Sequence, residues 1–433
     1  MMAAGEAARK MIRRISSSID PVTRGWAVVA TGSAARLALG FVASVLIARS
    51  LGPAGFAVFA VLAAASGIAG AAADLGLSDA GVKRVAEVWT RDPAEGRRRG
   101  RVFFWLRLSA AVVLVSAGSL LAGPISRDLL GLSASPALLV LALLGVLATA
   151  MSGAATTLLQ ATGRFGAITA VMLTNSGLTA LLAAGLAVTG ALNLVTALAV
   201  LGICTSLAAF AVARRLLPVA WSLGIPDLGL LLAEGKPLLR FGGWLWIGGI
   251  LAMLAAQLDL LLLNRWSDAT TVGAYGLALN LAAKADVLNH SLYTVLLPAA
   301  SGLGVGYAGR AHPRRGLLRG VLLGAALLPL FPLAGPLIEL FYGPAYTAAV
   351  PLFQLLLGVA IFELIATPFL LLAFTFNRPR LIAEAEAVRV ATLGATCLWL
   401  IPILGPAGAA VARLASRVAG AAVVLGVLRP WRM

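Results

Sequence analysis

The sequence predicts an all-α polytopic membrane protein, with twelve transmembrane helices arranged as two six-helix lobes around a central cavity. Three observations support this prediction: twelve apolar stretches, a one-sided distribution of Lys and Arg, and a repeat that relates the two halves of the chain. Hydrophobic residues make up 60% of the 433 residues. A soluble domain has no core that could bury so much apolar sequence in one block.

The apolar stretches follow one another with short connections. A spanning helix needs roughly 20 mostly apolar residues, at ~1.5 Å per residue, to cross a hydrocarbon core ~30 Å thick. We expect spans at residues 26–47, 56–77, 102–122, 137–158, 166–188, 193–213, 241–263, 273–297, 317–338, 349–372, 381–403 and 407–427. A basic tail (1–25) precedes the first lobe (26–213), a linker (214–240) leads to the second lobe (241–427), and a short tail (428–433) follows.

The basic residues lie almost entirely on one side of these predicted spans. The formal net charge is +17, which in a soluble chain would suggest nucleic-acid binding. Here most of the 34 Lys and Arg residues fall in the tails and in alternate loops, whereas the opposite loops hold only Arg49, Arg127 and Arg265. Under the positive-inside rule, both termini are cytoplasmic in a bacterial inner membrane. The charge is then explained by topology, and we expect no nucleic-acid partner.

The two halves of the chain resemble each other. The first turn on the Arg-poor side, Leu46–Arg49, recurs about half the chain later as Leu262–Arg265. A second stretch, Leu158–Arg164, recurs at nearly the same spacing as Leu371–Arg378. With six spans per half, the repeats have the same orientation and pair about an axis along the membrane normal. Such a two-lobed bundle with a cavity between the lobes is typical of transporters.

Several short motifs occur in a fixed order along nearly the whole chain. They are Ser44–Pro53, Asp74–Ser78, Leu239–Gly242, Gln257–Asp259, Phe341–Tyr346, Asn377–Arg380 and Ile401–Ala410. In these motifs the chain resembles the polysaccharide (O-antigen, Wzx-type) flippases of the multidrug/oligosaccharidyl-lipid/polysaccharide (MOP) exporter superfamily.

This resemblance implies a MATE-like fold and export of undecaprenyl-diphosphate-linked oligosaccharide from the inner to the outer leaflet. It also implies that glycosyltransferases and a polysaccharide polymerase act on the same lipid-linked substrate. Two departures point away from the related lipid II flippases. Those are expected to carry two further C-terminal spans, and their second arginine in the first helix falls on Val42 here.

Five cations lie deep within predicted spans, where a lipid-facing charge is costly. They are Arg36, Arg413, Arg417, Lys284 and Arg389. Arg36 is ten residues into the first span, ~15 Å deep at ~1.5 Å per residue, which is the midplane. One interpretation is that these cations line a cavity and bind a diphosphate, since guanidinium groups bind phosphate oxygens in pairs. The alternative is pairing with buried acids, for which Asp286, Glu363, Glu384 and Glu386 are available.

Acidic and polar residues within the spans are candidates for ion coupling. Asp286 and His290 lie one turn apart on the eighth span, and Asp259 lies near the Arg-poor end of the seventh. Intramembrane acids mark ion pathways, so exchange of H⁺ or Na⁺ at Asp286, Asp259 or His290 would drive transport. A hydrogen-bonded seam between helices is the alternative.

Other functions are less consistent with the sequence. Cys204 and Cys397 fall in apolar stretches and indicate neither a disulfide framework nor a metal site. We expect no cofactor and no enzymatic activity, because the loops on the Arg-poor side lack a catalytic or metal-ligand cluster. A multidrug exporter is an alternative, although a cavity lined with arginine would repel cationic drugs. A glycosyltransferase or glycan polymerase would need a larger external loop, and a scaffold would not need buried arginines.

Overall fold

The computed structural model describes residues 21–131, 136–218, 224–302, 311–370 and 379–428. For residues 21–31, 244, 286–302, 311–316, 369–370, 379–380 and 382 it describes the backbone alone. Within these residues every regular element is helical. The all-α prediction is therefore confirmed.

The helices of the N-terminal half run in the order α2 to α9. They are α2 (Pro21–Asp74), α3 (Leu77–Trp89), α4 (Pro93–Leu120), α5 (Ala122–Pro124), the π-helix η1 (Ile125–Leu129), α6 (Pro136–Ala161), α7 (Phe165–Val188), α8 (Leu194–Thr196), the π-helix η2 (Ala197–Cys204) and α9 (Thr205–Leu216). The C-terminal half begins with α10 (Leu228–Trp266), α11 (Ala269–Gly302), α12 (Ala311–Leu327) and α13 (Leu330–Tyr342). It ends with the 3₁₀ turn η3 (Pro344–Tyr346), α14 (Ala349–Leu370), α16 (Pro379–Leu404) and α17 (Pro406–Leu428).

Three of the sharp bends between helical segments share a Gly-Pro pair. Gly52, Gly343 and Gly405 have φ values of +64°, +92° and +58°. This region favours glycine because a Cβ would clash with the following carbonyl oxygen. A proline follows each of them and begins the next helical segment, since its fixed φ suits a helix. The N–H that proline lacks would have no acceptor within the helix at this first position. At Gly52 this bend divides α2 into a first arm (21–51) and a second arm (53–74).

Nine helices in the described part of the chain are long and apolar enough to cross a membrane, or ten if α12 and α13 form one span bent by 45°. The protein is therefore a multi-pass membrane protein. The long α2 counts once among the nine, although Gly52 breaks it, and α11 continues into residues whose side chains are not described. The number twelve stays a prediction, as do the lobe boundaries and the tails.

Part of the predicted linker is helical. Residues Leu228–Leu232 are the first turns of α10. This helix continues without interruption to Trp266 and tolerates Pro237 in its early turns. α10 packs against α2, α3 and α4 of the N-terminal half as well as α16 and α17 of the C-terminal half. It therefore joins the two halves of the molecule.

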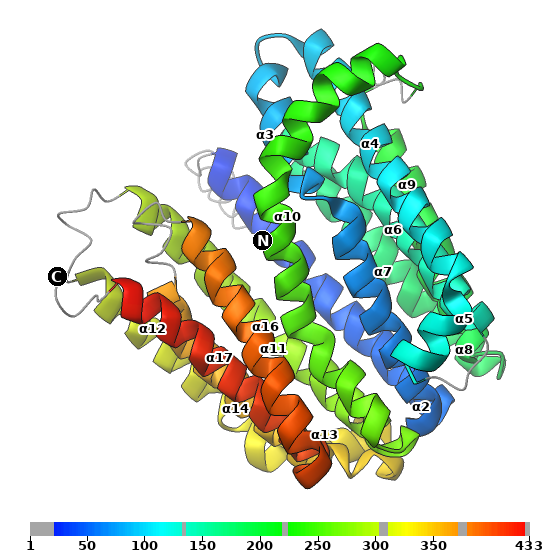
Figure 1. The fold of residues 1–433 in the computed structure, drawn as a ribbon, viewed down its shortest axis with the longest axis vertical. Coiled ribbons are helices and arrows are strands. Elements are labelled where there is room, and N and C mark those ends of the chain that lie inside the picture. The colour runs from blue at the N-terminus through cyan, green and yellow to red at the C-terminus, as the bar shows by residue number, and fades with distance from the viewer. Residues whose placement is uncertain (1–20, 132–135, 219–223, 303–310, 371–378, 429–433) are drawn as a thin grey trace, which may run out of the picture.

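Figure 1 shows that the helices of the two halves approach each other at one end and diverge towards the other. The diverging end carries α3, the start of α4 and the start of α10, and we call it the basic end because the arginine-rich 97–101 segment lies there. The opposite end carries the bend of α2, the segment α5–η1 and α13, and we call it the closed end.

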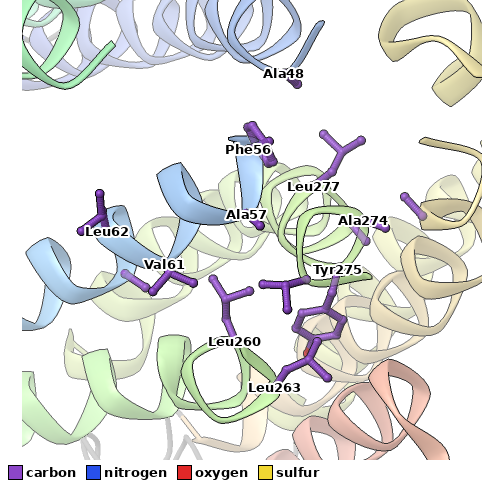
Figure 2. Close-up of a cluster of buried hydrophobic side chains, with 14 of the residues drawn as sticks. Ala48, Phe56, Ala57, Val61, Leu62, Leu260, Leu263, Ala274, Tyr275 and Leu277 are labelled. Atoms are coloured by element: carbon purple, nitrogen blue, oxygen red, sulfur yellow. The ribbon is translucent and has the colours of Figure 1, made fainter. Parts of the chain in front are cut away.

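The main hydrophobic core lies between the two halves. Phe56, Ala57 and Val61 of the second arm of α2 are buried together with Leu260 of α10 and Tyr275 of α11. Figure 2 shows these side chains around the crossing of the helices. Gly276 permits this approach, since a Cβ there would lie 3.0 Å from the Cβ of Ala60. A second cluster, around Phe103 and Leu158, lies in the N-terminal half and includes Leu238 of α10.

Candidate functional site

The motif at the end of the first arm of α2 contacts the Phe341–Tyr346 motif of the other half. The Tyr346 hydroxyl donates to the carbonyl oxygen of Ala48 at 2.8 Å, and the hydroxyls of Ser44 and Tyr342 lie 3.2 Å apart. Tyr342 and Tyr346 are both buried. Two stretches that the sequence offered only as separate motifs thus form one interface at the closed end.

Two arginines from corresponding positions of the repeat each bind a carbonyl oxygen of the opposite half. Nη2 of Arg49 donates to the carbonyl of Leu340 at 2.6 Å, and Nη1 of Arg265 donates to that of Asp128 at 3.3 Å. Asn264, beside Arg265, donates to the carbonyl of Leu130 at 2.6 Å. The predicted repeat therefore appears as a pair of related clasps across the closed end. We call the Arg49 and Arg265 contacts the closed-end clasps.

The turn that follows Arg265 is fixed locally. Asp268 accepts hydrogen bonds from the Thr271 hydroxyl at 2.6 Å and from the Thr271 backbone N–H at 3.0 Å. These hydrogen bonds lower the pKa of Asp268, because they stabilise its ionised form. The same turn brings Gly273 against Pro53, whose carbonyl oxygen would lie 2.0 Å from a Cβ on Gly273. The first turns of both halves are thus in backbone contact.

A second backbone contact joins the halves at the basic end. Gly76, at φ +66°, lies against α10, where a Cβ would come within 2.1 Å of the carbonyl oxygen of Gly242. The Asp74–Ser78 and Leu239–Gly242 motifs therefore meet in space. Nearby, Arg107 of α4 lies 3.1 Å from Asp74 and donates to the Ser78 hydroxyl at 2.7 Å. The structure thus pairs the Arg107 guanidinium with the Asp74 carboxylate.

Arg36 is exposed on the first arm of α2. Ser44, eight residues nearer the closed end, lies on the same side of this arm and contacts Tyr342 of the other half. Arg36 is ~12 Å from Ser44 along the helix axis, towards the end at which the halves diverge. No ion pair among the described side chains includes it. Its role in binding substrate stays a prediction.

Arg413 and Asp259 form a buried ion pair between α17 and α10. Nε and Nη2 of Arg413 contact the two carboxylate oxygens of Asp259 at 2.7 and 2.8 Å. Nη2 also donates to the carbonyl of Ala256 at 2.6 Å, and the Tyr275 hydroxyl donates to Asp259 at 2.5 Å. The exposed fractions are 0% for Asp259 and 7% for Arg413. Paired, hydrogen-bonded charges of this kind are tolerated inside a membrane.

This pair brings together two residues to which the sequence suggested separate roles. Arg413 was a candidate for binding phosphate and Asp259 for exchanging an ion. Both lie seven residues from the closed end of their helices, Pro406–Leu428 and Leu228–Trp266, and so at equal depth. This equal depth is the feature of the sequence from which the pairing of Arg413 with Asp259 could have been predicted. Neither role is tested by the geometry.

One turn further along α17, Arg417 belongs to a second cluster. Its Nε lies 2.6 Å from Glu363 of α14, which is also 3.4 Å from Nη2 of Arg389 on α16. Nη1 of Arg389 contacts Glu386, one turn earlier on α16. The two arginines and two glutamates balance in charge. Arg389 and Arg417 thus contact two of the buried acids that the sequence offered as partners, which leaves their proposed contact with substrate untested.

The remaining candidates lie on α11. Nζ of Lys284 donates to the Asn280 side chain at 3.0 Å, one turn away. Asp286 and His290 belong to α11, but their side chains lie outside the described part of the structure. α11 packs against α2 of the opposite half. Lys284 therefore lies on a helix of the interface, and the ion-coupling role of the other two stays a prediction.

No group of His, Cys, Asp and Glu residues that could hold a metal ion occurs among the described residues. Cys204 is exposed and Cys397 is buried, and both are free thiols.

The solved structures that are similar to this chain include membrane transporters. One is described as an inward-facing multidrug resistance MATE family transporter of the MOP superfamily; it matches with a TM-score of 0.69 and 16% identity over 92% of this chain and 95% of that one. The lipid II flippase MurJ in an inward closed conformation matches with a TM-score of 0.66 and 12% identity, over 93% and 87%. A variant of a Vibrio cholerae MATE transporter matches with a TM-score of 0.62 and 16% identity, over 95% and 96%.

No curated protein sequence matches the chain. A family model described as "Polysaccharide biosynthesis protein" matches residues 22–303, which is more than half of the chain. This match and the fold confirm the resemblance found in the sequence motifs. The chain therefore belongs to the polysaccharide biosynthesis protein family and has the fold of the MOP superfamily.

Proposed function

We propose that the protein is a flippase that moves undecaprenyl-diphosphate-linked oligosaccharide from the cytoplasmic to the outer leaflet of a bacterial inner membrane. The family match and the MOP fold support a transporter for surface polysaccharide synthesis. The lipid II flippase among similar structures supports a lipid-linked substrate. The positive-inside rule supports a cytoplasmic basic end. Glycosyltransferases and a polymerase would supply and use the substrate.

The observation that carries this proposal is the exposure of Arg36, which the sequence predicts to lie at mid-membrane depth. A charged side chain at this depth normally faces a partner or an aqueous space. Arg36 has no ion-pair partner among the described side chains, and the hydrogen bonds of its helix arm to Tyr342 and Tyr346 lie nearer the closed end. A planar guanidinium in this position suits a diphosphate, which needs cationic hydrogen-bond donors to leave water.

We take the structure to be a state in which the two halves are joined at the closed end and diverge towards the basic end. In alternating access, the closed-end clasps of Arg49 and Arg265 must break before substrate leaves on the other side. Both bonds end on backbone carbonyls and lie at the exposed rim of the interface, so they can exchange with water at low cost. The clasps are therefore suited to a reversible gate.

Exchange of H⁺ or Na⁺ would drive the cycle. We propose Asp286, with His290 beside it on α11, as the leading site for this exchange. Asp259 is the second candidate, and its tight pair with Arg413 means that ion binding there would first have to separate two buried charges.

The test is a leaflet assay in a strain that lacks the gene. Without the protein, undecaprenyl-diphosphate-linked glycan is expected to accumulate on the inner leaflet, and wild type should reverse this. Arg36→Ala should fail at an unchanged protein level, and Arg36→Lys should restore function only in part, since lysine lacks the planar pair of donors. Arg91→Ala, at an exposed arginine on the basic side, is the matched control.

Normal export by Arg36→Ala would contradict the assigned role of this arginine. Unchanged lipid-linked pools in the deletion strain would remove this substrate class. The multidrug resistance transporters of the same fold make drug export the second candidate. Efflux of a cationic dye, lost in the deletion strain and restored by wild type, would favour it.

A further inference from the structure

A long apolar groove lies between the N-terminal half and α10. Its volume is about 820 Å³, and its walls come from the second arm of α2, from α4, from η1 with the start of α6, and from α10. Val113 of α4 is 68% exposed and Leu129 of η1 is 70% exposed, so the groove is open along its length. It belongs neither to the cation clusters of the C-terminal half nor to the closed-end clasps.

The groove is as long as the membrane is thick. Its lining residues on α10 run from Leu239 near the basic end to Leu261 near the closed end. At ~1.5 Å per residue this span is ~33 Å, compared with a hydrocarbon core of ~30 Å. An acyl chain of a phospholipid covers only half of that core. The groove therefore matches one hydrocarbon chain that is longer than a leaflet.

The chemistry of the lining is equally specific. Among the described residues that line it, only Ser109 and Trp246 carry polar side-chain atoms. The Ser109 hydroxyl donates to the carbonyl of Leu106 at 2.9 Å, and Nε1 of Trp246 donates to that of Ala72 at 3.0 Å. Both donors are satisfied by the protein itself. None of the described residues that line the groove is charged, so they offer nothing to the phosphate of a phospholipid headgroup.

Small residues on two facing helices leave room for a branched chain. Ala110, Ala117 and Gly118 of α4 face the groove, as do Ala69 and Ala72 of α2. Small side chains in a membrane interface allow close packing of the group opposite them. Methyl branches at regular intervals, as in a polyprenyl chain, would fit between such positions.

We propose that this groove binds the polyprenyl chain of the substrate while its diphosphate is carried between the two halves. The assignment rests on the proposed flippase function. Apolar contact has no direction, so the same groove accepts the chain whether the headgroup is at the basic end or at the closed end. Because α10 contacts both halves, a chain in the groove remains in contact with the protein as the halves move.

The experiment measures how binding depends on chain length. The purified full-length protein in phospholipid nanodiscs is titrated with undecaprenyl diphosphate and with farnesyl diphosphate, which share a headgroup and differ in chain length. Ala110→Trp and Ala117→Trp fill the groove at two heights. Ala211→Trp is the control, since Ala211 is exposed on α9 and does not line the groove.

Wild type and the control are expected to bind the long chain more tightly than the short one. In the two groove variants the affinity for the long chain should fall by roughly tenfold, because overfilling a packed site is unfavourable. Their affinity for the short chain should not change, which also shows that they are folded.

Equal binding of both probes by wild type would mean that the groove holds ordinary lipid and would overturn the assignment. So would a preference for the long chain that persists in both groove variants. Binding of neither probe by wild type would instead overturn the proposed function, and the groove assignment with it.

Discussion

Removing both closed-end clasps is expected to shift the protein towards the state that is open at the closed end. In Arg49→Ala and Arg265→Ala, each change removes one hydrogen bond from a guanidinium to a carbonyl of the opposite half. Both bonds are exposed to solvent, so we take the typical value for a neutral hydrogen bond, about 1 kcal/mol each, in place of the larger value for a charged donor. The double variant loses about 2 kcal/mol of closure, which is a factor of about thirty in the conformational equilibrium.

The shift is measurable as a distance between the two halves. Spin labels at Val195 on α8 and Ile403 on α16 suit this measurement, because both residues are exposed at the closed end and belong to opposite halves. The background is a variant without Cys204 and Cys397. A minor open state of about 1% would rise to roughly a fifth of molecules in the double variant.

The control and the refuting result follow from the same geometry. Arg127 lies at the same end, but its Nε donates to the carbonyl of Gly123 in its own half. Arg127→Ala should therefore leave the distance distribution unchanged. If the double variant of Arg49 and Arg265 gives the wild-type distribution, the clasps do not hold the halves together and the gate assigned to them is wrong.

Three further predictions concern the interior. Arg413→Met should destabilise the protein by about 3–5 kcal/mol, since it leaves Asp259 charged and buried. Adding Asp259→Leu should recover most of this loss. Equal melting temperatures of the single and double variants would contradict the pairing of Arg413 with Asp259. Gly76→Ala should lower the melting temperature strongly, because Gly76 has a φ of +66° and the new Cβ would lie 2.1 Å from a backbone oxygen. Gly70→Ala is the control and should leave the melting temperature unchanged, because a Cβ there would meet open space. Asp286→Asn should abolish the pH or Na⁺ dependence of transport in proteoliposomes, and a dependence identical to wild type would exclude this residue from coupling.

The sequence alone determined the class of the protein, for a clear physical reason. Backbone polar groups in a bilayer must be satisfied within each spanning segment, so long apolar stretches can only be helices or closed barrels. The repeat around Arg49 and Arg265 was also readable, because both turns begin with Leu and end with Arg, at a spacing of about half the chain. The Gly-Pro pairs at Gly52 and Gly405 were visible as motifs, and the structure shows that they bend the chain between helical segments.

The partners of the buried charges were decided by tertiary structure. Asp259 and Arg413 are 154 residues apart in the chain, and no local pattern says which acid meets which arginine when several lie at similar depth. The motifs around Gly76 and Gly242 are likewise far apart in the sequence, and only the tertiary structure shows that their backbones are in contact. Sequence periodicity describes one helix face at a time, whereas the site, the clasps and the groove depend on which faces of distant helices meet.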